Sequence, residues 1–189
     1  CPSAELFVDK IIEVGILELN EERAVLKVDK EIIINDGDKR CVISPSNVFS
    51  VNFEIEFSDP ISNQSFSFVE DRKRYIEDIS KARSFLIFPI DMGEDPWKNY
   101  RKQFKSLPKI FPSDPKKCQF ITHTHEKFLT PLNYPEEPAR HKILDFIGDL
   151  FCLGIHVEGH FDLFKTGHSF NHKIIKKLQE EYALHQKTN

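Results

Sequence analysis

The chain has 189 residues, of which 40% are hydrophobic and 12% aromatic, so it carries enough apolar surface to bury one packed domain. Its formal net charge of −4 argues against a general nucleic-acid binder, because neutralising phosphates needs a clustered excess of lysine and arginine. No apolar run approaches the length that crosses a bilayer, so we expect no transmembrane segment and keep peripheral contact with a membrane open.

The cysteines are far apart in the sequence and form no C-x-x-C pair. This spacing is not that of a zinc ribbon or of a dense disulfide framework. It favours a reducing compartment, and we therefore expect a cytoplasmic protein.

The first third of the chain predicts one helix followed by short strands. Apolar residues at helical spacing begin at Leu6 and end before Gly15, which predicts a short amphipathic helix. Runs rich in β-branched and aromatic residues predict strands at 24–28, 31–35, 40–44 and 48–57. The Asp36-Gly37 pair favours a tight hairpin between the second and third runs. We expect these strands to form an antiparallel meander.

The rest of the chain predicts helices and strands around one segment that is hard to assign. Asp59-Pro60 ends the meander, and residues 91–117 are rich in proline. The predicted elements are a helix at 70–81, a strand at 85–90, a helix at 97–104, a hairpin at 118–130, a helix at 136–153, a strand at 155–164 and a helix at 169–185. This order predicts an α+β fold, a two-layer sandwich in which a mostly antiparallel sheet packs on helices, with an inserted excursion at about 86–117.

The predicted helix at 136–153 carries an unusual polar stripe. Its apolar arc must face a core, whereas His141, Asp145 and Asp149 recur at i, i+4 and i+8 on another side. An imidazole and a carboxylate one turn apart can hold one divalent ion, and both suit zinc. A hydrogen-bonded or solvated pair is the commoner explanation of such spacing when it stands alone. Gly148, beside the stripe, costs about 1 kcal/mol inside a helix, which predicts a close approach at that point.

Other histidines offer weaker candidates. His156, Glu158, His160 and Asp162 alternate along one predicted strand, which places four possible ligands on one face. Apolar residues between them favour an ordinary half-buried strand whose polar side faces water. The turn that contains residues 123–126 predicts exposed histidines there, and the lysine-rich terminal helix predicts a solvated face.

Two motifs and their spacing resemble a known enzyme family. The run RHKILDFIGDL at residues 140–150 and the run KTGHSFN at 165–171 are similar to the signature of the UDP-3-O-acyl-N-acetylglucosamine deacetylases of lipid A synthesis. Shorter matches at residues 36–39, 55–60 and 82–85 follow in the family's order. The resemblance covers nearly the whole chain except roughly residues 86–117.

The resemblance implies a zinc-dependent amide hydrolysis and assigns roles to the stripe. His141 and Asp145 match zinc ligands, and the metal would polarise the N-acetyl carbonyl and lower the pKa of bound water. Asp149 matches the carboxylate that orients a histidine, and His168 matches that histidine, which stabilises the oxyanion and protonates the leaving amine. Ser84 stands where the family usually has a threonine whose hydroxyl assists at the oxyanion.

The resemblance also implies two contacts with the substrate UDP-3-O-acyl-N-acetylglucosamine. Lys142 matches a lysine that helps to hold it, and a point cation suits its diphosphate. Phe85 matches an aromatic residue that packs on the sugar region. In the excursion, apolar residues could form a passage for the acyl chain or merely cover the sheet, and both interpretations stay open; they are Trp97, Phe104, Leu107, Ile110 and Phe111.

One part of the family pattern is absent from this chain. The family's third zinc ligand and its general base come from a Glu-His pair in an N-terminal domain, and this sequence contains no Glu-His dipeptide. We therefore expect residues 1–20 to be the last helix of a preceding N-terminal domain and 21–189 to be the C-terminal half of the enzyme. That N-terminal domain, on the same or a separate chain, would be a required partner, and this chain alone would be inactive. The alternative is a non-catalytic homologue that binds a nucleotide-sugar lipid or a protein partner.

Overall fold

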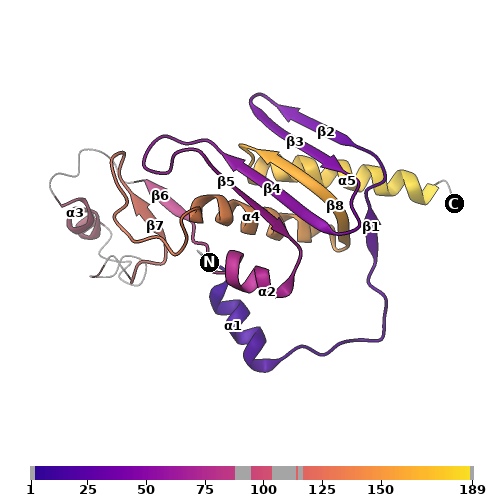
Figure 1. Cartoon of the computed structure of the whole chain (residues 1–189), viewed down its shortest axis with the longest axis horizontal. Helices are drawn as coiled ribbons and strands as arrows, with labels where there is room; N and C mark the ends of the chain where they lie inside the picture. The colour runs from indigo at the N-terminus through magenta and orange to yellow at the C-terminus, as the bar shows by residue number, and fades with distance from the viewer. Residues whose placement is uncertain (1–2, 88–94, 104–113, 115–116, 188–189) are drawn as a thin grey trace.

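The computed structural model describes residues 3–87, 95–103, 114 and 117–187. Its helices are α1 (Glu5–Val14), α2 (Arg72–Arg74), α3 (Pro96–Gln103), α4 (Glu137–Leu150) and α5 (His168–Lys187), with a π-helical turn η1 (Tyr75–Ile79) and a 3-10 turn η3 (Phe151–Leu153). Its strands are β1 (Val25–Lys27), β2 (Ile32–Asp36), β3 (Lys39–Ser44), β4 (Phe49–Ile55), β5 (Gln64–Val69), β6 (Phe85–Ile87), β7 (Ile121–His123) and β8 (His156–Phe164). The predicted α+β class is confirmed, and most of the predicted helices and strands are present (Figure 1).

The main sheet has six strands, with five in the order β2-β3-β8-β4-β5 and β1 paired to the start of β8. The pairs β2–β3, β3–β8 and β4–β5 are antiparallel, and β8 runs parallel to β4 and β1. The hairpin at Gly37 is confirmed, but the predicted meander is wrong because β8 lies between β3 and β4. The sequence prediction also missed β5, whose apolar and polar residues alternate after the loop at Asp59-Pro60. Pairing between strands more than 100 residues apart leaves no local signal in a sequence.

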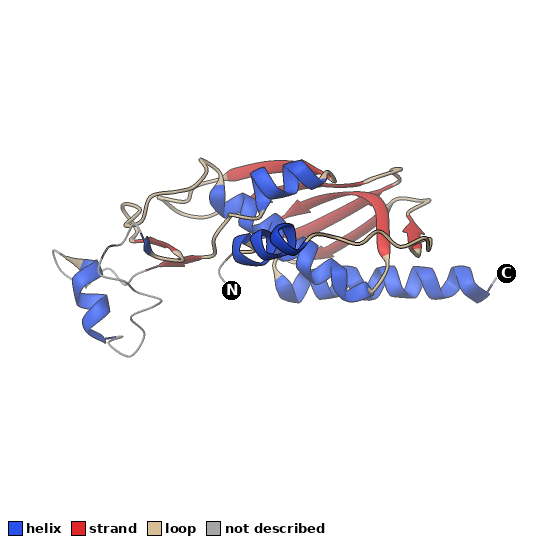
Figure 2. Cartoon of the chain, turned by 90° about the horizontal axis from the view of Figure 1, so that it is seen from below, coloured by secondary structure: helices blue, strands red, loops and turns tan. Residues whose placement is uncertain are grey.

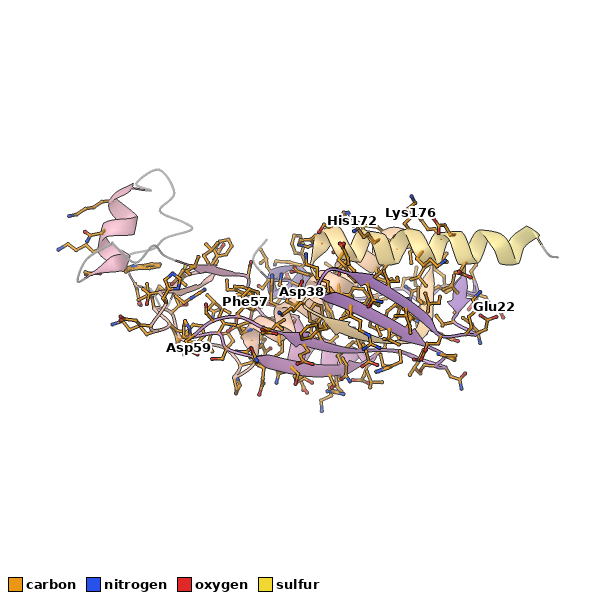
Figure 3. The ribbon with its side chains drawn as sticks, turned by 90° about the horizontal axis from the view of Figure 1, so that it is seen from above. Glu22, Asp38, Phe57, Asp59, His172 and Lys176 are labelled. Carbon is orange, nitrogen blue, oxygen red and sulfur yellow. The ribbon has the colours of Figure 1, made fainter. Side chains whose placement is uncertain are left out.

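The two long helices cover one face of this sheet (Figure 2). The apolar arc of α4 packs on β8 and β4, where the Phe146 and Phe161 rings lie 5.2 Å apart between centroids. The first part of α5 buries Phe170, Ile174 and Leu178 in the same core. The opposite side of α5 is solvated as predicted: His172 and Lys176 are exposed there (Figure 3).

A smaller unit lies beyond the N-terminal end of α4, at the opposite end of the molecule from the C-terminus (Figure 1). Strands β6 and β7 pair in parallel, and Trp97 of α3 is buried with Cys118 in a separate small cluster. The predicted hairpin at 118–130 is formed in part: His123 of β7 bridges Phe128 in the antiparallel sense, and the backbone N–H groups of Thr124 and Leu129 donate to the Lys127 and Thr122 carbonyls. The prediction that His123 is exposed is wrong: it is 5% exposed because its ring packs on Phe128, whereas His125 is exposed. The other apolar residues named for the acyl passage, Phe104, Leu107, Ile110 and Phe111, lie outside the described residues.

Helix α1 ends at Gly15, whose positive φ of 86° closes the helix as the sequence predicts. None of its residues is buried, and the apolar side chains from Leu6 to Leu19 are largely exposed. Its first turn is tied to the body by the Ala4 N–H, which donates to the Ser80 carbonyl at 2.9 Å. Among the described helices, none is both long and apolar enough to span a membrane.

Candidate functional site

The polar stripe of α4 lies beside the loop that leads into β6. Its one imidazole and two carboxylate side chains are mostly shielded from solvent. The exposed fractions are 7% for His141, 16% for Asp145 and 15% for Asp149. His141 Nε2 lies 3.3 Å from Asp145 Oδ1, as expected for residues one helical turn apart. The spacing predicted from the sequence is therefore realised on one face of the helix.

The other nitrogen of His141 fixes the state of the imidazole. His141 Nδ1 lies 3.1 Å from the Ala82 carbonyl oxygen, which can only accept a hydrogen bond. A proton on Nδ1 therefore leaves the lone pair of Nε2 directed at the Asp145 carboxylate. Two acceptors in contact repel each other unless a cation, either a proton or a metal, lies between them.

The chemistry of this acceptor pair is of a kind that could hold a metal ion. Burial, the largest cause, lowers the pKa of His141, and the Asp145 carboxylate and the Ala82 carbonyl only partly oppose it. Two ligand atoms about 2.1 Å from a tetrahedral zinc lie about 3.4 Å from each other, which is close to the observed nitrogen–oxygen distance. Within the described residues, no group of three or more histidine, cysteine or acidic side chains could hold a metal. The pair thus has the chemistry of a half-site.

A histidine–aspartate contact lies next to this pair. His168 is the first residue of α5, and its Nδ1 lies 2.8 Å from Asp149 Oδ2. Its Nε2 points toward the metal half-site, 3.8 Å from Asp145 Oδ2. The same Asp149 oxygen accepts a 2.8 Å hydrogen bond from the Asn171 amide. The arrangement can hold a protonatable imidazole beside a bound cation.

The comparisons with known proteins decide the family. Residues 2–94 and 113–180 match the family described as UDP-3-O-acyl N-acetylglycosamine deacetylase. The chain belongs to this deacetylase family. The unmatched stretch between the two ranges falls within the excursion that the sequence predicted.

Curated relatives carry the name UDP-3-O-acyl-N-acetylglucosamine deacetylase. One from Nautilia profundicola is 35% identical over 96% of this chain and 59% of its own length. Those from Geotalea uraniireducens and Anaeromyxobacter sp. are 31% and 33% identical over 93% and 97% of this chain, and over 54% and 58% of their own lengths. The chain therefore spans somewhat more than half of these deacetylases.

The two residues expected at the substrate in a deacetylase of this family lie together. Lys142 Nζ lies 5.6 Å from the centre of the Phe85 ring and 3.0 Å from Asp145 Oδ2. Phe57, which the sequence prediction missed, packs edge-on against Phe85 at 5.4 Å. Ser84 is half-buried immediately before β6, two residues after the carbonyl that His141 contacts. Lys142 and Phe85 therefore lie beside Asp145, and Ser84 directly precedes Phe85 in the chain, while their roles stay predictions.

The four rival ligands on β8 do not gather into one site in the described part of the chain. His156 pairs with Glu70 at 3.2 Å, and Glu158 pairs with Lys27 at 3.2 Å. His160 contacts Ser50 at 2.8 Å on the face of the sheet that the helices leave open. His160 Nε2 also lies 3.3 Å from Asp162 Oδ1, so two of the four approach each other, but no group of three gathers among the described residues. Gly148 also differs from expectation, since a Cβ built on it would meet nothing within 4 Å apart from its chain neighbours and the backbone of its own helix.

Two partners in the site were not assigned a role from the sequence. Asn171 is buried and holds Asp149, and its place in the matched run at 165–171 is a signal that could have found it. The Ala82 carbonyl is a backbone group, which no residue type reveals. Only the folded loop brings it to His141.

Proposed function

We propose that this chain is part of a zinc-dependent deacetylase that hydrolyses the N-acetyl amide of UDP-3-O-acyl-N-acetylglucosamine and releases acetate in lipid A synthesis. The observation that carries the proposal is the acceptor pair of buried His141 and half-buried Asp145 beside the His168–Asp149 contact, in a chain of the deacetylase family. Zinc at this pair would supply a polarised carbonyl and a bound water of lowered pKa. The activity would take place in the cytoplasm, at or near a membrane surface.

Other residues of the chain would bind the metal, stabilise the oxyanion, donate the proton and hold the substrate. His141 and Asp145 would hold the metal, and the Ser84 hydroxyl would donate to the oxyanion. His168 would keep a proton on Nε2 for the leaving amine, and the Asp149 carboxylate at 2.8 Å would stabilise the imidazolium form. An amine leaves poorly unless it is protonated, so this dyad matches the demand of amide hydrolysis. The Lys142 ammonium and the Phe85 ring would receive the diphosphate and the sugar.

The half-site needs further ligands, which we place in an N-terminal domain that carries a Glu-His pair. Residues 1–189 contain no Glu-His dipeptide, and their described part offers two converging ligands. We expect residues 1–189 by themselves to bind zinc weakly and to release little acetate, because binding free energy depends on a complete ligand set.

The test compares residues 1–189 with the whole polypeptide that their gene encodes. Acetate release from UDP-3-O-acyl-N-acetylglucosamine and zinc affinity are measured for both, and for His141→Ala in the whole polypeptide. We expect activity in the whole polypeptide and a loss of at least about 100-fold in His141→Ala. His156→Ala, a histidine on β8 paired with Glu70, is the matched control and should remain active.

Two outcomes would contradict the proposal. Full activity of residues 1–189 alone would show that no further ligand is required. A whole polypeptide that binds the nucleotide sugar but releases no acetate with zinc would instead support a non-catalytic homologue.

A further inference from the structure

Two side chains of α4 hold the peptide group that joins Ala82 to Arg83, one at its carbonyl and the other at its N–H. Its carbonyl oxygen lies 3.1 Å from His141 Nδ1, and its N–H donates to Glu137 Oε1 at 3.0 Å. Glu137 and His141 are one helical turn apart, so both reach the same loop. Because a peptide group is planar and rigid, fixing its N–H end also fixes the direction of its carbonyl.

The carboxylate at the N–H end of this peptide is itself fixed. Glu137 is fully buried, and its two oxygens also accept from Arg83 Nε at 2.8 Å and Arg83 Nη2 at 3.0 Å. The backbone N–H of Asn133 donates to Glu137 Oε2 at 2.6 Å. Arg83 continues to the Cys118 and Pro131 carbonyls at 3.2 and 2.7 Å. The orientation of the carboxylate is therefore determined by donors from separate segments of the chain.

We propose that Glu137 is a positioning residue that acts through the Ala82–Arg83 peptide to hold His141 with Nε2 toward Asp145. A charged acceptor on the N–H polarises the peptide, which strengthens its carbonyl as the acceptor for Nδ1–H. The acceptor bound to a ligating histidine sets its tautomer and raises its basicity toward metal. The consequence for zinc rests on the proposed function, whereas the control of the tautomer is a property of the metal-free chain.

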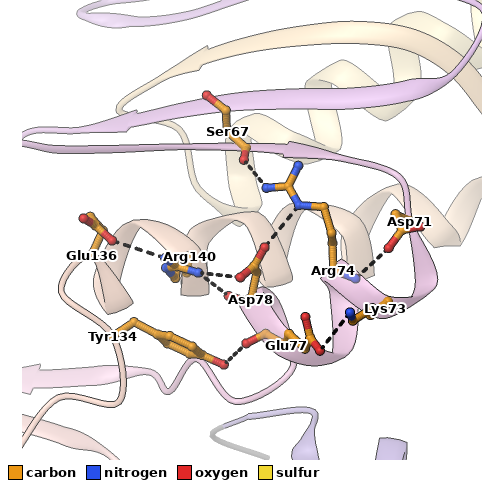
Figure 4. Close-up of polar contacts among 9 residues, drawn as sticks. All are labelled: Ser67, Asp71, Lys73, Arg74, Glu77, Asp78, Tyr134, Glu136 and Arg140. Carbon is orange, nitrogen blue, oxygen red and sulfur yellow. Dashed lines mark hydrogen bonds and ion pairs between the residues drawn. The ribbon is translucent and has the colours of Figure 1, made fainter.

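A purely structural ion pair is the competing explanation, and a second cluster allows the two to be separated. Arg140, immediately before His141, contacts Asp78 at 3.4 Å and Glu136 at 3.3 Å (Figure 4). Its guanidinium also lies 3.8 Å from the centre of the Phe66 ring. This cluster anchors the first turns of α4 independently of Glu137, so we expect the helix to keep its place in a Glu137 variant.

The decisive variant is Glu137→Gln in the whole polypeptide. A glutamine offers one oxygen, so its amide N–H group must face donors of Arg83 or Asn133, and the arrangement around the peptide is lost. In the metal-free protein, nitrogen-15 NMR should show wild-type His141 with its proton on Nδ1 and the variant with a mixture of tautomers. Zinc affinity should fall about 10- to 100-fold.

Two further variants serve as controls. Glu136→Gln removes the same charge one residue away, where the side chain is 41% exposed, and should leave the tautomer and the zinc affinity unchanged. Arg83→Lys keeps the backbone N–H at position 83 but loses the paired hydrogen bonds from the guanidinium to Glu137. It should lower the free energy of unfolding while His141 retains its Nδ1–H tautomer.

The outcomes distinguish this inference from the proposed function. A proton on Nε2 of wild-type His141 would overturn the inference even if Glu137→Gln failed to fold. An unchanged tautomer in folded Glu137→Gln would also overturn it, as would equal tautomer loss in Arg83→Lys. If the tautomer changes as expected but wild-type protein binds no zinc and releases no acetate, the positioning role stands and the proposed function fails.

Discussion

His168 and Asn171 both contact one oxygen of Asp149, although 19 and 22 residues separate them from it along the chain. Both belong to the first turn of α5, whose positive end favours a carboxylate nearby. Asp149 lies near the C-terminal end of α4, where the helix dipole alone would disfavour its charge. The start of α5 therefore offsets the unfavourable effect of the α4 dipole on the charge of Asp149. The same contact directs the His168 imidazole toward Asp145.

We expect Asp149→Asn to slow acetate release by the whole polypeptide about 10²- to 10⁴-fold, the usual contribution of a positioned acid–base group. An amide keeps the shape of the side chain but cannot stabilise a charged imidazole. Zinc affinity should stay near the wild-type value, because the proposed metal ligands in this chain are His141 and Asp145. The assay is acetate release together with a zinc titration.

The matched control is Asp162→Asn, an aspartate 3.3 Å from His160 on the open face of the sheet. It changes the same chemistry without touching α4 or α5, so activity should persist. Wild-type rates in Asp149→Asn would remove the dyad from the mechanism.

At the scale of elements, β8 is the strand that organises the sheet and supports α4. It pairs with β3 on one side and β4 on the other, and its inward residues contact the apolar arc of α4. Gly159 occurs where β8 passes closest to the segment after β1: an added Cβ would lie 2.8 Å from Val28 Cγ2 and 3.3 Å from Val28 Cβ. Valine is stiff at χ1, so it cannot easily move away.

We therefore expect Gly159→Ala to lower the free energy of unfolding by about 1–3 kcal/mol, the range for overpacking a core. Gly148→Ala provides the opposite case, because a Cβ added to this residue of α4 would meet nothing within 4 Å apart from its chain neighbours and the backbone of its own helix. Alanine should raise the free energy of unfolding there by about 1 kcal/mol. Urea denaturation of both variants measures the difference, and equal effects of the same sign would contradict this account.

At the scale of the whole molecule, many of the exposed large apolar side chains in the described part of the chain lie before β1. Val14, Leu17 and Leu19 are 85%, 83% and 70% exposed, in a segment that also includes the unburied helix α1. Contiguous exposed apolar side chains are typical of an interface. That residues 1–20 are the last helix of a preceding N-terminal domain stays a prediction.

We expect residues 1–189 alone to self-associate through this surface as concentration rises. Replacing Leu17 and Leu19 together with serine should reduce the association, measured by sedimentation velocity, and change the free energy of unfolding by less than about 0.5 kcal/mol. Ile33→Ser, on β2 and 51% exposed, is the control and should leave the association unchanged. Strictly monomeric wild-type protein would rule this surface out as the cause.

The sequence alone determined the elements with a strong local period and the residues that repeat with it. Helix α4 could be predicted because apolar side chains recur every three to four residues, and the same period placed His141, Asp145 and Asp149 on one stripe. The hairpin at Gly37 and the end of α1 at Gly15 followed from backbone conformations that favour glycine. The family resemblance added a role for Lys142 within α4, and it added His168, Phe85 and Ser84, which no local period connects to that helix.

Only the tertiary structure decided which distant segments meet. The insertion of β8 between β3 and β4 depends on pairing across more than 100 residues, and two strands of similar alternation are equally good neighbours in sequence terms. The burial of His123, the contact of Asn171 with Asp149 and the Ala82 carbonyl at His141 have the same origin. A backbone carbonyl is present at every residue, so its role at a site depends entirely on where the chain folds it.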